Sequence, residues 1–194
     1  MRYRKGKMIW ALLVAALFAL PAGAAQAAEF SAIIVTTLRG EARQGKIYIK
    51  GDKVRREFAQ SGGTAIVILQ GDKKIMWMLE PQTQSYLEMP FDKEAFAKTL
   101  NQPKEGEGKK LLGTETMNGY VTDKYETAVK TATGTLRSTM WIAQKLGVPI
   151  RIETADKSFV QEYKDIKEGG VDDALFEMPA GYQKKAMPPG MPKP

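Results

Sequence analysis

Short apolar runs separated by turn residues characterise the stretch from Gly45 to Pro90. The runs alternate with Gly-Asp, Gly-Gly and Pro-containing turns, a pattern that predicts a β-meander of antiparallel strands joined by tight turns. Two of the runs, Ala65–Leu69 and Ile75–Leu79, are apolar at every position. A strand with one face in water should alternate between apolar and polar residues. We therefore expect these two strands to be covered on both faces.

Further strands are predicted on both sides of the meander, from runs that are β-branched or alternate in polarity. Phe30–Leu38 is predicted as the first strand and Ala42–Lys50 as the second, with a bulge at Gly45. Asn118-Gly119 is typical of a type I′ turn and predicts a hairpin. The later strands are predicted at 111–117, 120–130, 135–143, 148–155 and 158–166.

One segment has helical instead of strand periodicity. Asp92 is a suitable N-cap for a helix over Lys93–Asn101, and Phe96 and Leu100 form an apolar i,i+4 pair on it. So short a helix is not stable alone, and we expect it to dock on the second apolar face of the meander. The polar, Gly-rich segment 102–110 is predicted to be a surface loop.

These elements define the expected fold class. About eleven short antiparallel strands surround one inserted helix, and so many strands in one open sheet must curl. We predict a mainly β (α+β) protein with a strongly curved antiparallel sheet of about 11 strands. This sheet would form a half-open barrel wrapped around one or more helices.

The first 27 residues have the features of a secretory signal peptide. A basic start precedes an apolar run from Met8 to Leu20, and Ala25-Gln26-Ala27 is a typical cleavage motif. The chain has no cysteine, so no lipid anchor is expected, and the predicted location is periplasmic. The predicted organisation is a signal peptide at 1–27, one domain at 28–184 and a Pro-rich flexible tail at 185–194.

Charge and residue usage exclude several function classes. The 29 basic residues include four in the leader; without them, 25 basic residues face 22 acidic ones, a net charge of +3. This modest, interspersed charge does not predict a nucleic-acid partner. Cysteine and histidine are both absent, which removes thiol nucleophiles, disulfides, histidine triads and the usual zinc sites. No metal and no cofactor are expected.

Two carboxylate pairs are candidates for acid–base chemistry, Asp172 with Asp173 and Glu80 with Glu88. The aspartates fit better as the cap of one helical turn over Ala174–Phe176. The glutamates flank a turn and are expected to be solvated. An enzymatic function and catalytic residues are therefore not predicted.

Ten apolar residues form the candidate lining of a ligand cavity. The alternative is that they form an ordinary closed core. The methionines among them favour a cavity, because their flexible side chains suit apolar ligands of variable shape. The candidate lining consists of Ile66, Ile68, Met76, Trp77, Met78, Phe96, Leu100, Met140, Trp141 and Ile142.

Arg55 and Arg56 are the candidates for contact with an anionic head group, because the guanidinium is a planar, fork-shaped donor. The alternative is a solvated strand face on which these arginines make cross-strand pairs.

Several segments also resemble a known family when read in order: GKIYIKGDKVRREF, IMWMLEP, NGYVTDKYE, WIAQKLGVPIRIE and ALFEMPAGY. Together with the leader and the capped helix, they resemble a family of exported bacterial proteins of unknown function. That family is similar to the LolA/LolB superfamily of outer-membrane lipoprotein carriers. The resemblance implies a half-open barrel with helices closing an apolar concavity, which in the carriers receives acyl chains.

Two functions follow as expectations. The first is a non-enzymatic periplasmic binding or carrier protein that holds a lipid or lipoprotein acyl chain in the apolar concave sheet face. Its partners would be a lipid or an acylated lipoprotein. The second is a structural or sensory envelope module with a closed core that binds a partner protein.

Overall fold

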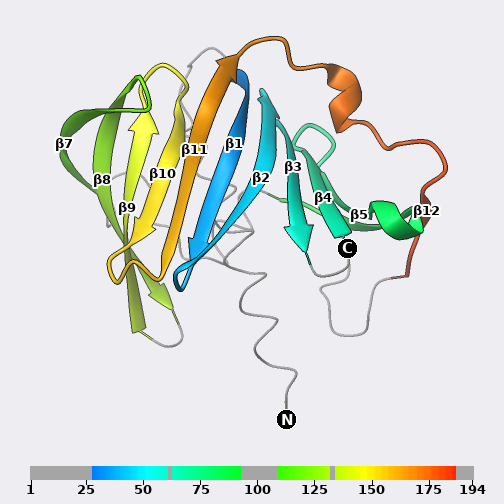
Figure 1. Ribbon diagram of the computed structural model, residues 1–194, viewed down its shortest axis with the longest axis horizontal. Helices are drawn as coiled ribbons and strands as arrows, with labels where there is room; N and C mark the ends of the chain where they lie inside the picture. Colours follow the sequence, from blue (N-terminus) through cyan, green and yellow to red (C-terminus); the bar gives the residue numbers. More distant parts are fainter. Residues whose placement is uncertain (1–27, 61–62, 93–108, 132–133, 187–194) are drawn as a thin grey trace.

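The computed structural model describes residues 28–60, 63–92, 109–131 and 134–186. These residues form one sheet in the order β12-β6-β5-β4-β3-β2-β1-β11-β10-β9-β8-β7. All neighbours are antiparallel except β12, which pairs parallel to β6. Figure 1 shows an open, curved sheet with β7 at one end and β12 at the other. The predicted fold class is confirmed.

The strands are β1 (Glu29–Leu38), β2 (Glu41–Lys50), β3 (Lys53–Gln60), β4 (Gly63–Gln70), β5 (Ile75–Glu80), β6 (Ser85–Pro90), β7 (Lys109–Met117), β8 (Tyr120–Thr131), β9 (Gly134–Ala143), β10 (Val148–Thr154), β11 (Phe159–Glu168) and β12 (Gln183–Lys184). Two 3-10 turns, η1 (Pro81–Thr83) and η2 (Asp173–Phe176), complete the described elements. None of the described helices is long and apolar enough to cross a membrane.

Local turn chemistry agrees with the sequence at two predicted positions. Asn118 and Gly119 have φ angles of 50° and 83°, as a type I′ turn requires, so the predicted hairpin is confirmed. The predicted cap of η2 is confirmed as well, since Asp172 accepts a hydrogen bond from the backbone N–H of Ala174.

Two local predictions are wrong. Gly45 makes no bulge, because the β1–β2 register passes through it without a shift. A Cβ at Gly45 would lie 2.3 Å from the backbone oxygen of Glu57, so the glycine is needed for close strand approach. Lys109 and Lys110, expected to end a surface loop, are the first residues of β7. The rest of that predicted loop lies outside the described residues.

The sheet has two faces, which we name after residues on β1 and β2. The Ile34 face contains the cross-strand row Phe30, Ile49, Val54, Leu69 and Met76 together with Ile34, Ile47, Val67 and Tyr163. The Tyr48 face contains the row Tyr48, Arg55, Ile68 and Trp77 together with Ile66 and Leu79.

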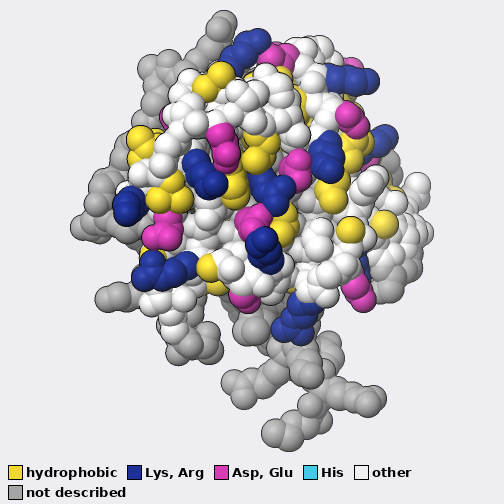
Figure 2. All heavy atoms as spheres, turned by 60° about the vertical axis from the view of Figure 1, so that its left-hand side comes forward, with side chains coloured by type: hydrophobic (Ala, Val, Ile, Leu, Met, Phe, Trp, Pro, Cys, Tyr) yellow, Lys and Arg dark blue, Asp and Glu magenta, His cyan; other side chains and the backbone are white. Residues whose placement is uncertain are grey.

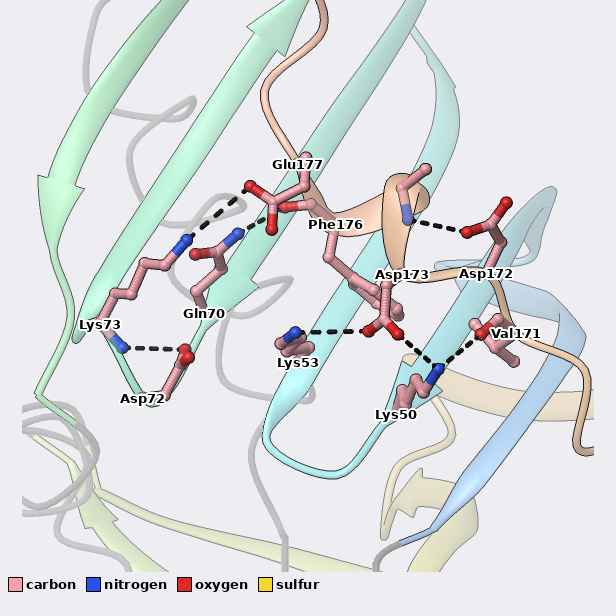
Figure 3. A network of polar contacts seen from close by, with 11 residues as sticks. Lys50, Lys53, Gln70, Asp72, Lys73, Val171, Asp172, Asp173, Phe176 and Glu177 are labelled. Atoms are coloured by element: carbon pink, nitrogen blue, oxygen red, sulfur yellow. Dashed lines mark hydrogen bonds and ion pairs between the residues drawn. The ribbon is translucent and has the colours of Figure 1, made fainter.

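The Tyr48 face is covered by the segment that follows β11, which we name the C-terminal strap (Val171–Lys185). Val171 and Phe176 of the strap are buried in one apolar cluster with Ile66, Ile68 and Trp77. The turn η2 contacts β3 and β4, and Figure 3 shows it beside the strands that carry Lys53 and Gln70. Covering of the meander on its second face, expected from the sequence, is thus confirmed, and the cover comes from the end of the domain.

Polar contacts anchor the start of the strap. Lys50 Nζ lies 2.8 Å from an Asp173 carboxylate oxygen and 3.1 Å from the Val171 carbonyl oxygen. Gln70, which is fully buried, donates to the Phe176 carbonyl oxygen at 2.6 Å (Figure 3). The Arg55 guanidinium donates to the Leu175 carbonyl oxygen at 3.0 Å.

The end of the strap adds β12 to the sheet, a strand that the sequence does not predict. The N–H of Gln183 donates to the Gln84 carbonyl at 2.9 Å, and the N–H of Lys185 donates to that of Tyr86 at 2.8 Å. Lys184 and Lys185 also form ion pairs with Glu88 and Glu80, both at 2.7 Å. The strap therefore crosses the sheet from β2 to β6.

The predicted helix over Lys93–Asn101 lies outside the described residues, and its docking on the meander stays a prediction. The signal peptide at 1–27 and tail residues 187–194 also lie outside them.

We predict that Phe176→Ala lowers the free energy of unfolding by about 3–5 kcal/mol, because it removes a fully buried aromatic side chain and leaves a cavity over β4. Denaturant titration followed by tryptophan fluorescence measures this, since Trp77 lies in the same cluster. Glu177→Ala, at the exposed neighbouring residue, is the matched control and should change stability little. Equal stability of both variants would contradict the docking of the strap.

Candidate ligand-binding face

The Ile34 face is an apolar surface that crosses the sheet from β5 to β11. Its central residues come from alternate positions of β1 to β4, which is why the period-two pattern places them together. Phe30, Ile34 and Ile47 are almost completely buried on this face. Met78 and Met89 pack against the same apolar cluster and remain half-buried.

Arg56 lies in the middle of this apolar face, between its cross-strand partners Ile47 and Val67. Only 4% of its surface is exposed. Its guanidinium donates to the Thr36 hydroxyl at 3.1 Å and lies 5.9 Å from the centre of the Phe58 ring. Burial lowers the pKa of Arg56 from its usual value, but the ordinary arginine pKa is so high that the side chain remains charged at neutral pH.

Three further polar side chains lie beside Arg56. Thr36 is paired across the strands with Gln161, and Tyr163 follows Gln161 on the same face. Gln161 is 2% exposed, and within the described part of the chain its Oε1 has no hydrogen-bond partner. A buried acceptor without a partner is unfavourable unless something donates to it. We name Thr36, Arg56, Gln161 and Tyr163 the polar cluster.

Burial of the Tyr163 ring raises the pKa of its phenol to about 12, and the positive charge of Arg56 opposes this rise. The polar cluster therefore presents one cation, two hydroxyl groups and one amide inside an apolar surface. It can bind an anionic or hydrogen-bonding group attached to an apolar chain.

The two candidate head-group arginines lie on opposite faces. Arg55 lies on the Tyr48 face, where its Nε donates to Glu57 at 2.8 Å and its terminal nitrogen donates to Leu175. It therefore helps to anchor the strap. Arg56 is the candidate that lies on the Ile34 face.

The structure divides the predicted apolar lining between both faces. Met76 and Met78 lie on the Ile34 face. Met140 lies on the same face, because it pairs with Ile152, which in turn pairs with Gln161. Ile142, two residues further along β9, is half-buried. Ile66, Ile68 and Trp77 lie under the strap on the Tyr48 face. Phe96 and Leu100 lie outside the described residues.

Trp141 lies on the opposite side of β9 from Met140. Lys124 and Arg151 lie against its ring, at 4.9 and 5.4 Å from the ring centre, and its indole N–H donates to Glu115. This hydrogen bond is the main cause that lowers the pKa of the Glu115 carboxyl, and the hydrogen bond and positive charge of Lys124 lower it further. Figure 2 shows the mixture of basic, acidic and apolar side chains on the side of the molecule that carries β7 to β9.

The predicted carboxylate pairs are held in structural contacts. Asp173 pairs with Lys50 and Lys53, and hydrogen bonds from these lysines lower its pKa. Glu80 and Glu88 pair with the strap lysines, whose hydrogen bonds lower both pKa values. Among the described residues, no three His, Cys, Asp or Glu side chains gather where they could hold a metal ion.

Thr36, Gln161 and Tyr163 were not predicted as site residues from the sequence. A signal for two of them exists in VQEYKDI (160–166), where Gln161 and Tyr163 occupy alternate positions of one strand. A glutamine on the core-facing side of a strand marks a buried polar site.

We predict that the free energy of unfolding decreases at alkaline pH because of Tyr163. Because its folded pKa of about 12 exceeds the ordinary 10.0, the unfolded chain ionises first, and stability present below pH 10 is lost as the pH rises toward 12. The two-unit difference corresponds to about 3 kcal/mol by pH 12.

Comparison of wild type and Tyr163→Phe by ultraviolet absorbance of the phenolate measures this titration. Their difference should titrate near pH 12, and denaturant titrations at increasing pH should show a smaller loss of stability in the variant. A difference titrating near pH 10 would show that Tyr163 is not buried.

The family described as "Domain of unknown function (DUF4412)" matches residues 32–148. No curated protein matches the sequence significantly. An uncharacterized conserved protein from Thermus thermophilus is similar in structure, with a TM-score of 0.56 and 12% identity, over 82% of this chain and 91% of that one.

MucB is also similar, with a TM-score of 0.51 and 12% identity, over 91% of this chain and 64% of the MucB chain. MucB in the Pseudomonas aeruginosa MucA/MucB complex has a TM-score of 0.49 and 13% identity, over 76% of this chain and 54% of that one. At these identities the structural likeness establishes the fold alone. The chain belongs to the DUF4412 family, whose function is unknown, and it shares its fold with the Thermus thermophilus protein and MucB, in agreement with the half-open barrel that the sequence resemblance implies.

Proposed function

We propose that the protein is a non-enzymatic periplasmic binding or carrier protein for the acyl chain of a lipid or lipoprotein. The acyl chain would lie against the Ile34 face, with the anionic head group or carboxylate of the lipid at Arg56. The observation that carries this proposal is one buried arginine, with Thr36 and Gln161 beside it, inside an apolar face of a curved sheet.

Physical chemistry supports this pairing of surface and charge. Each buried CH₂ group of an acyl chain contributes about 0.8 kcal/mol, so a single chain can bind without any catalytic group. The guanidinium fork suits a carboxylate or phosphate, and Gln161 Oε1 can accept a hydrogen bond from a ligand hydroxyl or amide. Half-buried Met78, Met89 and Met140 can adapt to chains of different shape.

The Tyr48 face is a poorer candidate for the same role. The strap already covers its apolar centre, and Phe176 is completely buried there. A ligand on that face would have to displace Phe176 and the hydrogen bond from Gln70.

The second candidate function is an envelope module with a closed core that binds a partner protein. The near-complete burial of Phe30, Ile34 and Ile47 favours it, because a closed core leaves these side chains no surface for a ligand.

Native mass spectrometry of the mature protein, purified gently from a periplasm, distinguishes the two functions. The carrier proposal predicts an adduct of lipid mass that is lost on extraction with organic solvent. A clean mass of the protein alone, with no uptake of a fluorescent fatty acid, would support the closed-core module instead.

For the head-group contact, we predict that Arg56→Gln weakens binding of a fluorescent fatty acid about tenfold or more, because a charge-assisted hydrogen bond to the carboxylate is lost. Arg55→Gln is the matched control, since Arg55 lies on the other face. It should leave the affinity within about twofold.

A fluorescent acyl chain with an uncharged methyl ester tests the charge itself and should bind both variants alike. Circular dichroism establishes that each variant is folded. An equal loss of fatty-acid affinity in both arginine variants, or a loss of affinity for the ester as well, would contradict the assignment of Arg56 as the head-group contact.

A further inference from the structure

Strand β7 ends the sheet, and within the described part of the chain no strand pairs with its outer edge. Residues 110–116 of β7 are exposed. Leu111 and Leu112 are 55% and 48% exposed, and both are among the few large apolar residues that the described chain exposes. In Figure 1, β7 lies at the left end of the sheet. A long edge strand with exposed leucines is a template for pairing with another chain.

The charged residues of β7 lie toward its two ends, with basic residues at one end and an acidic residue at the other. Lys109 and Lys110 lie at its start, and Glu115 lies toward its end. Lysines and bulges commonly prevent edge pairing, and β7 has a register shift between Leu111 and Gly113. This register shift also changes which residues of β7 share a face. Lys110 pairs with Glu126 and Glu115 pairs with Thr122, and since these two β8 residues are four apart, Lys110 and Glu115 share one face.

We propose that β7 pairs antiparallel with β7 of a second copy of this chain, about a twofold axis between Leu112 and Gly113. In this register Lys110 lies opposite the partner's Glu115, and Leu111 lies opposite the partner's Thr114. By symmetry each contact occurs twice, as in any isologous interface. A parallel alignment in register would instead place lysines beside lysines.

Local geometry supports close approach of the two strands. A Cβ at Gly113 would meet nothing within 4 Å, so this position is open to a neighbouring backbone. Trp141 and Lys124 hold the Glu115 carboxylate on the face that Lys110 shares. An anionic membrane or an acidic peptide would match the two lysines but would be repelled by Glu115, so the self-complementary order favours a second copy.

Sedimentation equilibrium over a range of protein concentrations tests the proposal on the lipid-free mature protein. The wild type should form a weak, concentration-dependent dimer, because a single strand pair buries little surface. Lys110→Glu and Glu115→Lys should each weaken dimerisation about tenfold or more, because like charges then oppose each other. An equimolar mixture of the two variants should recover a heterodimer, in which every pair again has opposite charges.

Lys157→Glu, in the exposed turn before β11, is the charge-matched control and should dimerise like the wild type. Thermal unfolding of each variant distinguishes lost pairing from lost folding, and Lys110 is exposed enough for Lys110→Glu to fold normally. A wild type that stays monomeric throughout, or a mixture that forms no heterodimer, would overturn the proposal. Because mass is measured without lipid, failure here is distinct from failure of lipid binding.

Discussion

Burial of β4 on both faces determines how the other elements are arranged around it. All residues from Ala65 to Gln70 are buried, so a sheet with one solvated face is excluded for this strand. On the Ile34 face, Val67 and Leu69 of β4 are buried in the main apolar cluster. On the Tyr48 face, Ile66 and Ile68 are buried beneath the strap. The ion pairs of the strap are largely exposed and contribute little each. Burial of Val171 and Phe176 is therefore the main force that holds the strap.

Assigning the strap to the Tyr48 face restricts where a ligand can bind. The strap covers the apolar centre of the Tyr48 face, and the opposite face contains the polar cluster. Burial of Arg56 and Tyr163 carries a desolvation penalty that an apolar core of similar volume does not have. The proposed binding function offers one reason for this penalty, since a bound anionic group would interact with the buried guanidinium.

Much of the fold is predictable from local patterns. Short apolar runs between turn residues located the strands of the meander, Asn118-Gly119 predicted a hairpin, and Asp172 identified the cap of η2. The strap was not predictable, because Val171, Phe176 and Tyr182 are spaced as a loop with scattered apolar residues, and only tertiary contact shows what they cover. β12 is missed for the same reason, since two residues form no pattern.

The candidate site was predictable only in part. Alternation places Arg55 and Arg56 on opposite faces, but it does not say which face the strap covers. Likewise, the apolar run Ile75–Leu79 alternates between faces, so Met76 and Met78 separate from Trp77 once the sheet forms. The bulge expected at Gly45 failed because a glycine in a strand also occurs where two backbones approach closely.

The proposed function places an acyl chain on the Ile34 face. Crosslinking with a photoreactive fatty acid, followed by residue-resolved mass spectrometry, tests this most directly, because neighbouring residues of one strand report on opposite faces. We expect labels with a period of two on β5, at Met76 and Met78 and not at Trp77, and an excess of unlabelled fatty acid should remove them. Labels at Trp77 and Ile68, or none that unlabelled fatty acid displaces, would contradict it.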